Sequence, residues 1–290
     1  MHVILFHNPR AGDEQHSRET VERLIREHGH SLEYYSTKED GWELGLARPG
    51  DLVAIAGGDG TVGKVLTELV TKEPRPVALL PLGSANNIAQ TLGLADRGLE
   101  ELVRRWPVAG RRPYRLGQLV TAGTRAIFAE TVGGGLFAES LRRSEETDGA
   151  DDKIEHGLRL LRRIVDELPA LEWRVDLDGS DRSGRFLAVE AMAIGWTGPG
   201  VPLAPAADPQ DSLLDVVRIC ERDRTALASY LDARLHKRAV PSLPLNVLRC
   251  TRAILQPPHA AAVRIDDELL GADGEALSVS VAGRPVEVLS

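Results

Sequence analysis

Three glycines around one aspartate, in the run Gly57-Gly58-Asp59-Gly60, are the residues of this chain whose types and spacing point most clearly to chemistry. They follow the apolar segment LVAIA and precede the helix-like segment VGKVLTELV. Because glycine has no Cβ, main-chain N–H groups can approach phosphate oxygens here, and a following helix adds its positive dipole end. The run therefore predicts a phosphate-binding loop. Asp59 would repel a bare polyphosphate, so either a divalent cation such as Mg²⁺ lies between them or the carboxylate points aside.

Two known phosphate-loop motifs can be fitted to this run. Gly58, Gly60 and Gly63 match the dinucleotide pattern G-x-G-x-x-G, but the next strand-like segment, VALLPLG, lacks the acid that would bind a ribose. The stretch Gly58–Lys64 matches G-x-x-x-x-G-K, but Val65 then stands where a hydroxyl would bind Mg²⁺. The sequence disfavours both motifs.

A second loop of similar composition, PLGSANNIA, begins at Pro81 after another apolar run. Ser84 can cap the following helix or donate to a phosphate, and Asn86 can bond a base, a ribose or the first loop. The earlier run Asn8–Gly12 follows the apolar segment VILFH and is also turn-forming. Because parallel strands end at one edge of a sheet, we expect the three loops to face a common cleft.

Strand-like and helix-like segments alternate over residues 1–113, the part of the chain that carries these loops. This alternation indicates an α/β domain with a mostly parallel sheet. From Tyr114, shorter β-rich runs between Gly, Pro and Asp predict an all-β, sandwich-like domain over 114–290. Two helical segments, His156–Leu168 and Arg224–Leu235, interrupt it. The expected linker is Arg104–Pro113, and the pattern leaves open that the last strand returns to the first domain.

The composition limits the partners of the protein. A formal net charge of −8 and a pI near 5.6 argue against a nucleic-acid binder and against general attraction to anionic membranes, so any membrane contact must be local. The two cysteines, Cys220 and Cys250, are too few for a disulfide framework. The sequence offers no signal-peptide pattern and no apolar run of the roughly 18 residues that a membrane span needs. We therefore expect a cytoplasmic protein.

The motifs NPRAG, GGDGT and PLGSANNIA, in this order and spacing, resemble the catalytic domain of the diacylglycerol kinase and sphingosine kinase family of lipid kinases, most closely the soluble bacterial diacylglycerol kinase type. The likeness continues in FAETVGGGLFAES and LAPAADPQDSLLDVV. GGDGT alone is shared with NAD kinases and relatives of phosphofructokinase, whereas the proline-glycine-serine-x-asparagine loop favours lipid kinases. The resemblance implies an ATP-dependent lipid kinase.

The resemblance also implies which residues bind the cofactors. Thr37 is included for ATP, although a threonine that merely ends a strand is an equal alternative. A Mg²⁺ site would use the carboxylate of Asp211 with the carbonyls of Asp208 and Leu213, and a plain acidic turn is its alternative. The ATP contacts implied are Asn8, Pro9, Arg10, Ala11, Gly12, Thr37, Gly57, Gly58, Asp59, Gly60, Thr61, Ser84 and Asn86.

Phosphoryl transfer to a lipid hydroxyl needs a base, and the family places an Asp-Gly-Glu near its C-terminus. Here Asp266-Asp267-Glu268 follows the strand-like VRI, whereas the literal match Asp273-Gly274-Glu275 lies in a turn. Strand alternation would point Asp266 and Glu268 to one face, so we expect these two, together with Asp59, to serve catalysis.

Several positions depart from the family pattern. Gly63 and Lys64 stand where the family has an Asn-Glu pair, Arg115 where an acid is common, and Ser212 where a turn glycine is usual. Lys64 could meet a phosphate in place of an acid. Two alternatives therefore stay open: an NAD kinase-like or other small-alcohol kinase, and a nucleotide-binding regulatory protein that has lost phosphoryl transfer.

The expected partner is a lipid substrate at a membrane surface, reached by transient peripheral contact, with no nucleic acid and with homodimerisation left open. The segment His156–Leu168 carries an apolar stripe beside Arg159, Arg162 and Arg163. It could lie on a membrane near the lipid entrance. Packing into the core is the favoured role.

Overall fold

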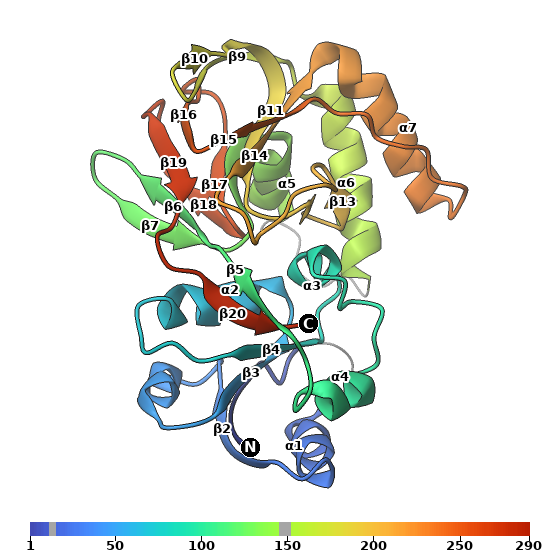
Figure 1. The fold of residues 1–290 in the computed structure, drawn as a ribbon. Helices are drawn as coiled ribbons and strands as arrows, with labels where there is room; N and C mark the ends of the chain where they lie inside the picture. The colour runs from blue at the N-terminus through green and yellow to red at the C-terminus, as the bar shows by residue number, and fades with distance from the viewer. Residues whose placement is uncertain (12–15, 145–151) are drawn as a thin grey trace. The chain divides into compact units, whose positions relative to one another are not determined.

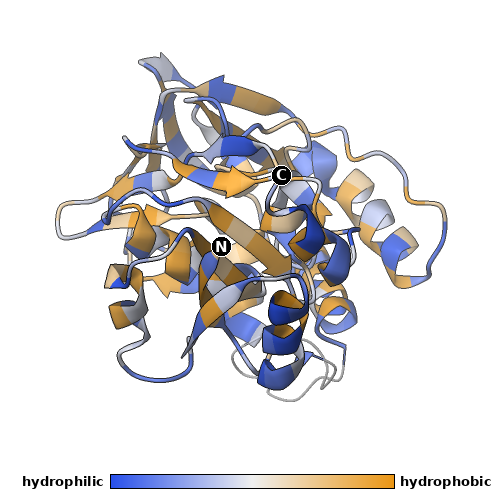
Figure 2. Ribbon diagram, turned by 60° about the horizontal axis from the view of Figure 1, so that its bottom comes forward, coloured by the Kyte–Doolittle hydropathy of each residue, from blue (hydrophilic) through white to orange (hydrophobic). Residues whose placement is uncertain are grey.

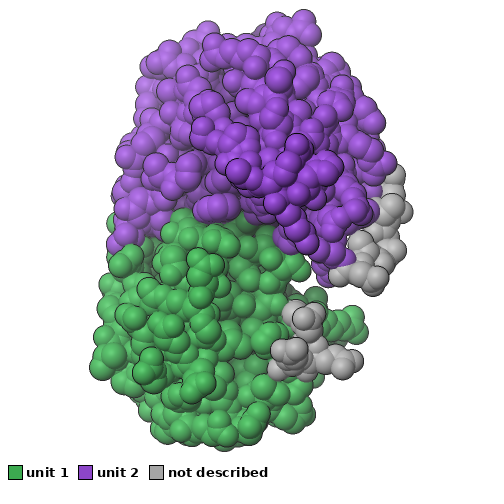
Figure 3. Space-filling model, turned by 90° about the vertical axis from the view of Figure 1, so that its right-hand side faces the viewer, with its two compact units in different colours: residues 1–116, 283–290 green, residues 117–282 purple. Residues whose placement is uncertain are grey.

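The computed structural model describes residues 1–11, 16–144 and 152–290, which form two compact units (Figures 1 and 3). Unit 1 comprises residues 1–116 and 283–290, and unit 2 comprises residues 117–282. The last strand of the chain therefore belongs to unit 1. Gly12, one of the expected nucleotide contacts, lies outside the described residues.

Unit 1 is built on a six-stranded sheet in the order β2-β1-β3-β4-β20-β5. The first four strands are parallel, and β20 runs parallel to β4 and antiparallel to β5. The connections that follow β1 to β4 therefore all begin at one edge, the carboxyl edge of the sheet. The strands are β1 His2–His7, β2 Ser31–Ser36, β3 Leu52–Gly57, β4 Val77–Pro81, β5 Arg111–Tyr114 and β20 Val286–Leu289.

Apolar side chains on both faces explain why this sheet is parallel and buried. All six residues of β3 are buried, as are the last five of β1, so both faces need covering helices. Helix α1 begins after Ser17, whose hydroxyl accepts the N–H of Thr20 at 3.3 Å as an N-cap. The helical segments are α1 Arg18–Glu27, the 3₁₀ segment η2 Trp42–Ala47, α2 Asp59–Leu69, α3 Asn87–Thr91 and α4 Leu99–Arg105.

Unit 2 is dominated by antiparallel pairing, as predicted for the second domain. Its main path runs β18-β17-β8-β11-β9-β16-β19-β6-β7, with β10 on β9, β14 on β11 and β15 on β14. β12 pairs with β13 separately. The strands are β6 Gly117–Val120, β7 Arg125–Phe128, β8 Thr131–Gly135, β9 Leu171–Leu177, β10 Ser180–Asp181, β11 Gly184–Met192, β12 Trp196–Thr197, β13 Val201–Pro202, β14 Leu214–Cys220, β15 Val247–Cys250, β16 Arg252–Gln256, β17 Val263–Ile265, β18 Glu268–Leu270 and β19 Leu277–Val281.

Two apolar clusters stabilise unit 2. One gathers side chains from the strands around Trp173. The other packs the helices on β11 and β14. Figure 2 shows both hydrophilic and hydrophobic colour on α7, the helix at the right. Helix α5 was not expected from the sequence, because a glycine-rich strand runs directly into it at Gly135, where φ is 90°. The helical segments are α5 Leu136–Ser144, α6 Lys153–Glu167, the 3₁₀ segment η3 Glu221–Asp223 and α7 Arg224–Leu235.

None of the helices in the described ranges is both long enough and apolar enough to cross a bilayer.

Candidate functional site

Four connections begin at the carboxyl edge of the unit 1 sheet. Residues 8–11 follow β1, Thr37 follows β2, residues 58–61 follow β3 and residues 82–87 follow β4. The register pairs His7 with both Ser36 and Ala56, and pairs Gly57 with Pro81, so neighbouring strands end nearly level. The three polar loops identified in the sequence, with Thr37, therefore lie along one edge of one sheet.

The two glycine-containing loops touch each other through their backbones. A Cβ on Gly83 would lie 2.4 Å from the Cα of Gly58, and a Cβ on Gly58 would lie 3.0 Å from the Cα of Gly83. Leu82 also donates its N–H to the carbonyl of Gly57 at 3.0 Å. The glycines are needed for this close approach. They also leave the backbone at the start of α2 without a Cβ at Gly58 and Gly60.

The carboxylate of Asp59 points aside, toward the second loop. Its Oδ2 accepts the N–H of Asn87 at 2.8 Å and its Oδ1 accepts the N–H of Ile88 at 2.9 Å, in the first turn of α3. Asn86, in the left-handed region with φ of 50°, holds the preceding bend because its side chain bonds both the N–H and the carbonyl of Gly83. Asp59 thus ties the two loops together. Of the two alternatives that the sequence left open, this is the one that needs no cation.

The remaining loop residues form a connected polar edge. Asn8 donates from Nδ2 to the hydroxyl of Thr61 at 3.3 Å, and its Oδ1 accepts the N–H of Arg10. Thr37 donates its N–H to the carbonyl of His7 at 2.9 Å. The Nζ of Lys64 donates to the carbonyl of Thr37 at 3.3 Å and lies 4.7 Å from the centre of the Trp42 ring. Of the other expected contacts, Pro9, Arg10 and Ser84 are exposed, and Ala11 is partly exposed.

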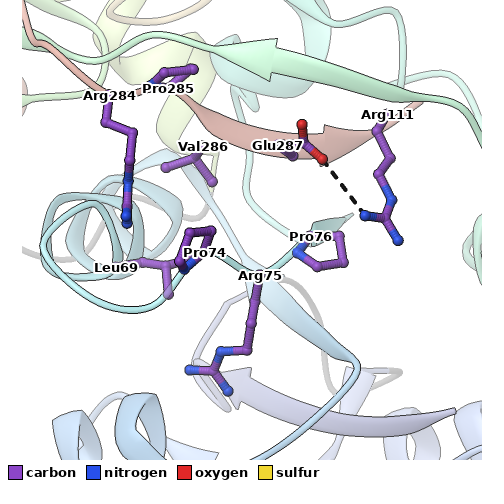
Figure 4. A pocket seen from close by; sticks show the side chains of 9 residues that line it. All are labelled: Leu69, Pro74, Arg75, Pro76, Arg111, Arg284, Pro285, Val286 and Glu287. Atoms are coloured by element: carbon purple, nitrogen blue, oxygen red, sulfur yellow. Dashed lines mark ion pairs between the residues drawn. The ribbon is translucent and has the colours of Figure 1, made fainter.

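A cavity of about 270 Å³ lies at the opposite edge of the same sheet (Figure 4). Its lining comes from Leu69 at the end of α2, from the residues just before β4, from residues 284–287 at the start of β20, and from Arg111. The side chain of Arg111 points toward Glu287, and its Nη1 lies 3.7 Å from that carboxylate. Arg75 donates to the carbonyls of Leu46 and Arg48. Because this cavity adjoins the amino ends of the strands, it is separate from the loops that carry the phosphate-binding pattern.

In unit 2, Asp266 lies in a hairpin turn. We expected a continuous strand in which Asp266 and Glu268 share a face, but β17 ends at Ile265 and β18 begins at Glu268, which pairs with Ile265 across the hairpin. Asp266 has a left-handed φ of 49°. The alternation argument therefore fails, because strand periodicity does not run through a two-residue turn. Glu268 is exposed.

Three consecutive backbone N–H groups hold the carboxylate of Asp266. Oδ1 accepts from Glu130 at 2.8 Å and from Thr131 at 3.0 Å, while Oδ2 accepts from Ala129 at 2.8 Å. Burial raises the pKa of Asp266 to about 6, against the opposing effect of these bonds, and the neighbouring Asp267 raises it further. An immobile carboxylate with a pKa near 6 is suited to accept a proton at neutral pH.

The rival turn at Asp273 is arranged differently. The Asp273 side chain is 91% exposed and lies 3.0 Å from Nδ1 of His259, while Glu275 accepts the N–H of Ala122 at 2.5 Å. The Asp273 carboxylate is thus open to solvent, whereas three backbone N–H groups enclose that of Asp266. The structure therefore favours Asp266 over Asp273 as the candidate base.

A buried ion pair that the sequence did not reveal contacts the Asp266 turn through the backbone carbonyl of Asp266. Glu190 is 0% exposed and lies 3.2 Å from Nη2 of Arg264, which is 5% exposed. Arg264 also donates to the hydroxyl of Thr197 at 2.6 Å and to the carbonyl of Asp266 at 2.9 Å. The hydroxyl of Thr131 donates to Glu190 at 2.8 Å. The partners are too far apart in sequence to be recognised as a pair, being 74 residues apart.

The acidic turn expected to bind Mg²⁺ is paired with a guanidinium from β15. Asp211 accepts the N–H of Leu213 at 2.8 Å through Oδ1, and Arg249 pairs with its Oδ2. The carbonyl of Asp208 accepts the N–H of Asp211 at 3.2 Å. Within the described ranges, no group of three or more His, Cys, Asp and Glu side chains could hold a metal ion. As arranged, the expected set of Asp208, Asp211 and Leu213 does not fit a bound cation, because Arg249 already compensates its charge.

Burial also raises the pKa of the nearby Asp215 to about 6, and Arg249, whose Nε lies 3.8 Å from that carboxylate, opposes the rise. Arg249 therefore serves two acids of this segment.

Two family models match the chain, one in each half. The diacylglycerol kinase catalytic domain matches residues 2–119, and the YegS C-terminal NAD kinase beta sandwich-like domain matches residues 130–288. The first covers the strands and loops of the unit 1 carboxyl edge. The second covers the Asp266 turn, the buried Glu190–Arg264 pair and the acidic turn at Asp211.

Individual relatives agree with these models. The chain is 30% identical over 226 residues to a Cronobacter sakazakii protein named as a probable lipid kinase YegS-like, with 73% of this chain and 72% of that protein aligned. A Chromohalobacter salexigens protein of the same name is 38% identical over 130 residues, which span 42% of this chain and 40% of that protein. The crystal structure of a diacylglycerol kinase from Bacillus anthracis has the same fold, with a TM-score of 0.70 at 17% identity over 99% of this chain and 96% of that one.

Proposed function

Because the chain belongs to the family of diacylglycerol kinases and YegS-like lipid kinases, which are ATP-dependent phosphotransferases, we propose that it transfers the γ-phosphate of MgATP to the hydroxyl of a diacylglycerol-like lipid. The main support is the pair of glycine loops at the carboxyl edge of unit 1, joined by the Gly58–Gly83 approach and by Asp59.

We assign the nucleotide to this edge. The N–H groups at the start of α2 and of the glycine loop would donate to phosphate oxygens, helped by the helix dipole. Asn8, Thr37 and Thr61 already bond one another or the strand ends, and they would fix the position of these loops. Mg²⁺, when bound with ATP, would neutralise charge on the polyphosphate. Since Asp59 is engaged by the second loop, we assign it to positioning that loop.

We assign the general base to Asp266. Its carboxylate would accept the proton of the lipid hydroxyl as that oxygen attacks the γ-phosphorus. Three N–H groups hold it in a fixed orientation, and a pKa of about 6 leaves it ionised at neutral pH yet basic enough to take a proton. Glu268, exposed beside the turn, would add negative charge near the acceptor or the metal.

One second candidate has a specific observation in its favour. The model that matches residues 130–288 is described as NAD kinase-like, so the same architecture also occurs with a nucleotide acceptor. The PLGSANNIA loop favours the lipid acceptor. A regulatory protein without transfer activity is the remaining alternative, because Gly63 and Lys64 depart from the family pattern.

A transfer assay separates these functions. The full chain is incubated with Mg²⁺ and ATP labelled in the γ-phosphate, and with separate acceptors: a diacylglycerol in mixed micelles, NAD, and glycerol. Label in the diacylglycerol product alone supports the proposal. Label in NAD supports the NAD kinase-like alternative. ATP binding without label in any acceptor supports the regulatory one.

A further inference from the structure

A long stretch of unit 2 contains no acidic residue. Between Asp232 and Asp266 there is neither Asp nor Glu, although the whole chain has 43 acids and a net charge of −8. Six lysine and arginine residues lie in this stretch, together with two histidines. Arg249 and Arg264 pair with acids of other segments, so the positive charge of this stretch lies on the remaining four cations, three of which are Arg234, Lys237 and Arg238 near its start.

The most exposed part of this stretch is the connection between α7 and β15, residues 236–246, which we term the basic connection. It has no helix or strand beyond a turn at its start, and residues 236–242 are all exposed. Figure 1 shows it, in orange after α7, at the periphery of unit 2. Pro241 and Pro244 remove two backbone donors from it, which disfavours pairing with another strand.

The basic connection presents charge and apolar surface together. Within the residues that the structure describes, neither Lys237 nor Arg238 takes part in an ion pair, whereas Arg234 one turn earlier donates to the carbonyl of Gly200 at 2.7 Å. Val240 is 45% exposed, one of the few large apolar side chains at the surface of the described chain.

The C-terminus of α7 fixes the direction in which these cations leave the helix. Lys237 donates its N–H to the carbonyl of Arg234 at 3.2 Å and Arg238 donates its N–H to that of Ala233 at 2.9 Å. Lys237 adopts a left-handed φ of 51°, the usual way in which such a cap ends a helix. The cap turns the chain out of the helix at Lys237, and both cations stand at the negative end of the helix dipole.

We propose that the basic connection is the surface through which this protein contacts an anionic membrane, an inference that rests on the proposed lipid acceptor. Exposed cations are attracted to acidic headgroups, and apolar side chains such as Val240 can enter the boundary between headgroups and acyl chains. The connection contains no Phe, Tyr or Trp side chain on which a nucleic-acid base could stack. A lipid surface therefore fits the combination better than RNA does.

Helix α6, the alternative element for membrane contact, is already packed against the rest of unit 2. Its apolar side chains Leu158, Leu161 and Ile164 pack into the core of unit 2. Arg159 pairs with Glu155, and Arg162 pairs with Asp166 and Asp232. The helix that the sequence offered for membrane contact thus has its apolar face buried and two of its arginines neutralised.

Vesicle sedimentation with the full chain tests the proposal. The protein is mixed, without nucleotide, with vesicles of phosphatidylcholine alone or with a third of phosphatidylglycerol. The test variants are Lys237→Gln/Arg238→Gln and Val240→Asp. The matched control is Arg104→Gln/Arg105→Gln, which removes the same charge from exposed positions on α4. Thermal melts check that each variant folds.

We expect the wild type to bind only to the anionic vesicles. The Lys237→Gln/Arg238→Gln variant should bind them about 30-fold more weakly, because each lost cation should lower the affinity roughly fivefold. Val240→Asp should also weaken it, and the control should bind like the wild type. Equal binding by the Lys237/Arg238 variant, or tighter binding of wild type to single-stranded RNA than to vesicles, overturns the proposal.

A second assay separates this inference from the proposed function. Phosphorylation of a short-chain diacylglycerol dissolved in detergent needs no membrane, so wild type and the Lys237/Arg238 variant should turn it over equally. If neither phosphorylates it while the vesicle result holds, the lipid kinase assignment fails and the membrane contact stands. A variant that loses turnover of the dissolved lipid as well shows that the connection serves the site itself and overturns the docking role.

Discussion

Replacing Arg264 by methionine should destabilise unit 2 strongly. The substitution keeps an unbranched chain of four side-chain atoms but removes the guanidinium that pairs with Glu190 and donates to the carbonyl of Asp266 and the hydroxyl of Thr197. Glu190 would be left in a site where it is 0% exposed, and among the described residues its one remaining donor would be the hydroxyl of Thr131. An isolated buried carboxylate is among the most costly groups in a protein.

The magnitude follows from this burial. Breaking a buried pair by removing one partner costs about 3–5 kcal/mol, a third or more of the free energy of unfolding of many domains. Burial already raises the pKa of Glu190 in the intact pair, and loss of Arg264 should raise it further. A carboxyl with a raised folded-state pKa contributes stability at low pH that is lost as pH rises through that pKa. The destabilisation should therefore be larger at pH 8 than at pH 5.

A double-mutant cycle measured by urea unfolding provides the assay. The set is Arg264→Met, Glu190→Leu and the combination, each measured at pH 5 and pH 8. Because the double variant leaves no unpaired charge, it should be more stable than Arg264→Met. The reasoning is refuted if the two single effects simply add, or if Arg264→Met costs less than about 1 kcal/mol at pH 8, well below the expected range.

Three further results are expected. Gly83→Ala should cost about 1–3 kcal/mol of unfolding free energy and weaken ATP binding, since its Cβ would lie 2.4 Å from Gly58, whereas Gly123→Ala, whose Cβ meets nothing within 4 Å, should do neither; equal effects in melts and ATP titrations would contradict this. Millimolar Mg²⁺ added after EDTA treatment should leave the melting temperature of the nucleotide-free wild type unchanged but raise that of Arg249→Gln, in which the acidic turn lacks its guanidinium; a shift in the wild type would return the metal to this turn. The pH profile of kcat/KM should fall below about pH 6 as Asp266 takes up a proton, and a flat profile between pH 5 and 8 would exclude it as the base.

Local sequence patterns predicted the fold class of this protein. Apolar strand-like runs that end in glycine or asparagine predicted an α/β domain, and the described structure and the family models confirm the fold class and the family. The loops after β1, β3 and β4 lie at one edge because parallel strands require it. That these loops bind ATP stays a prediction. The sequence did not predict helix α5, because one apolar run contains both the buried glycine-rich strand and the start of the helix.

Contacts between distant residues could not be predicted in the same way. Asp59 is a phosphate-loop acid by sequence, but its partners are amide groups 28 and 29 residues away. Arg249 pairs with Asp211 across 38 residues, at the turn that the sequence predicts as a Mg²⁺ site. The Asp266 hairpin was missed because period-2 reasoning assumes an unbroken strand. In each case tertiary pairing decides what a charged side chain does.

The measurement that tests the central assignment most directly is single-turnover transfer of the γ-phosphate from MgATP to a diacylglycerol, compared between Asp266→Asn and Asp273→Asn. Both variants remove one carboxylate from a turn near the C-terminus. Three backbone N–H groups hold Asp266, and burial raises its pKa to about 6, whereas the side chain of Asp273 is 91% exposed. We expect Asp266→Asn to slow the transfer step by about 10²- to 10⁴-fold with ATP binding retained, and Asp273→Asn to match the wild type. Full-rate transfer by Asp266→Asn, or its loss in Asp273→Asn, would contradict the assignment.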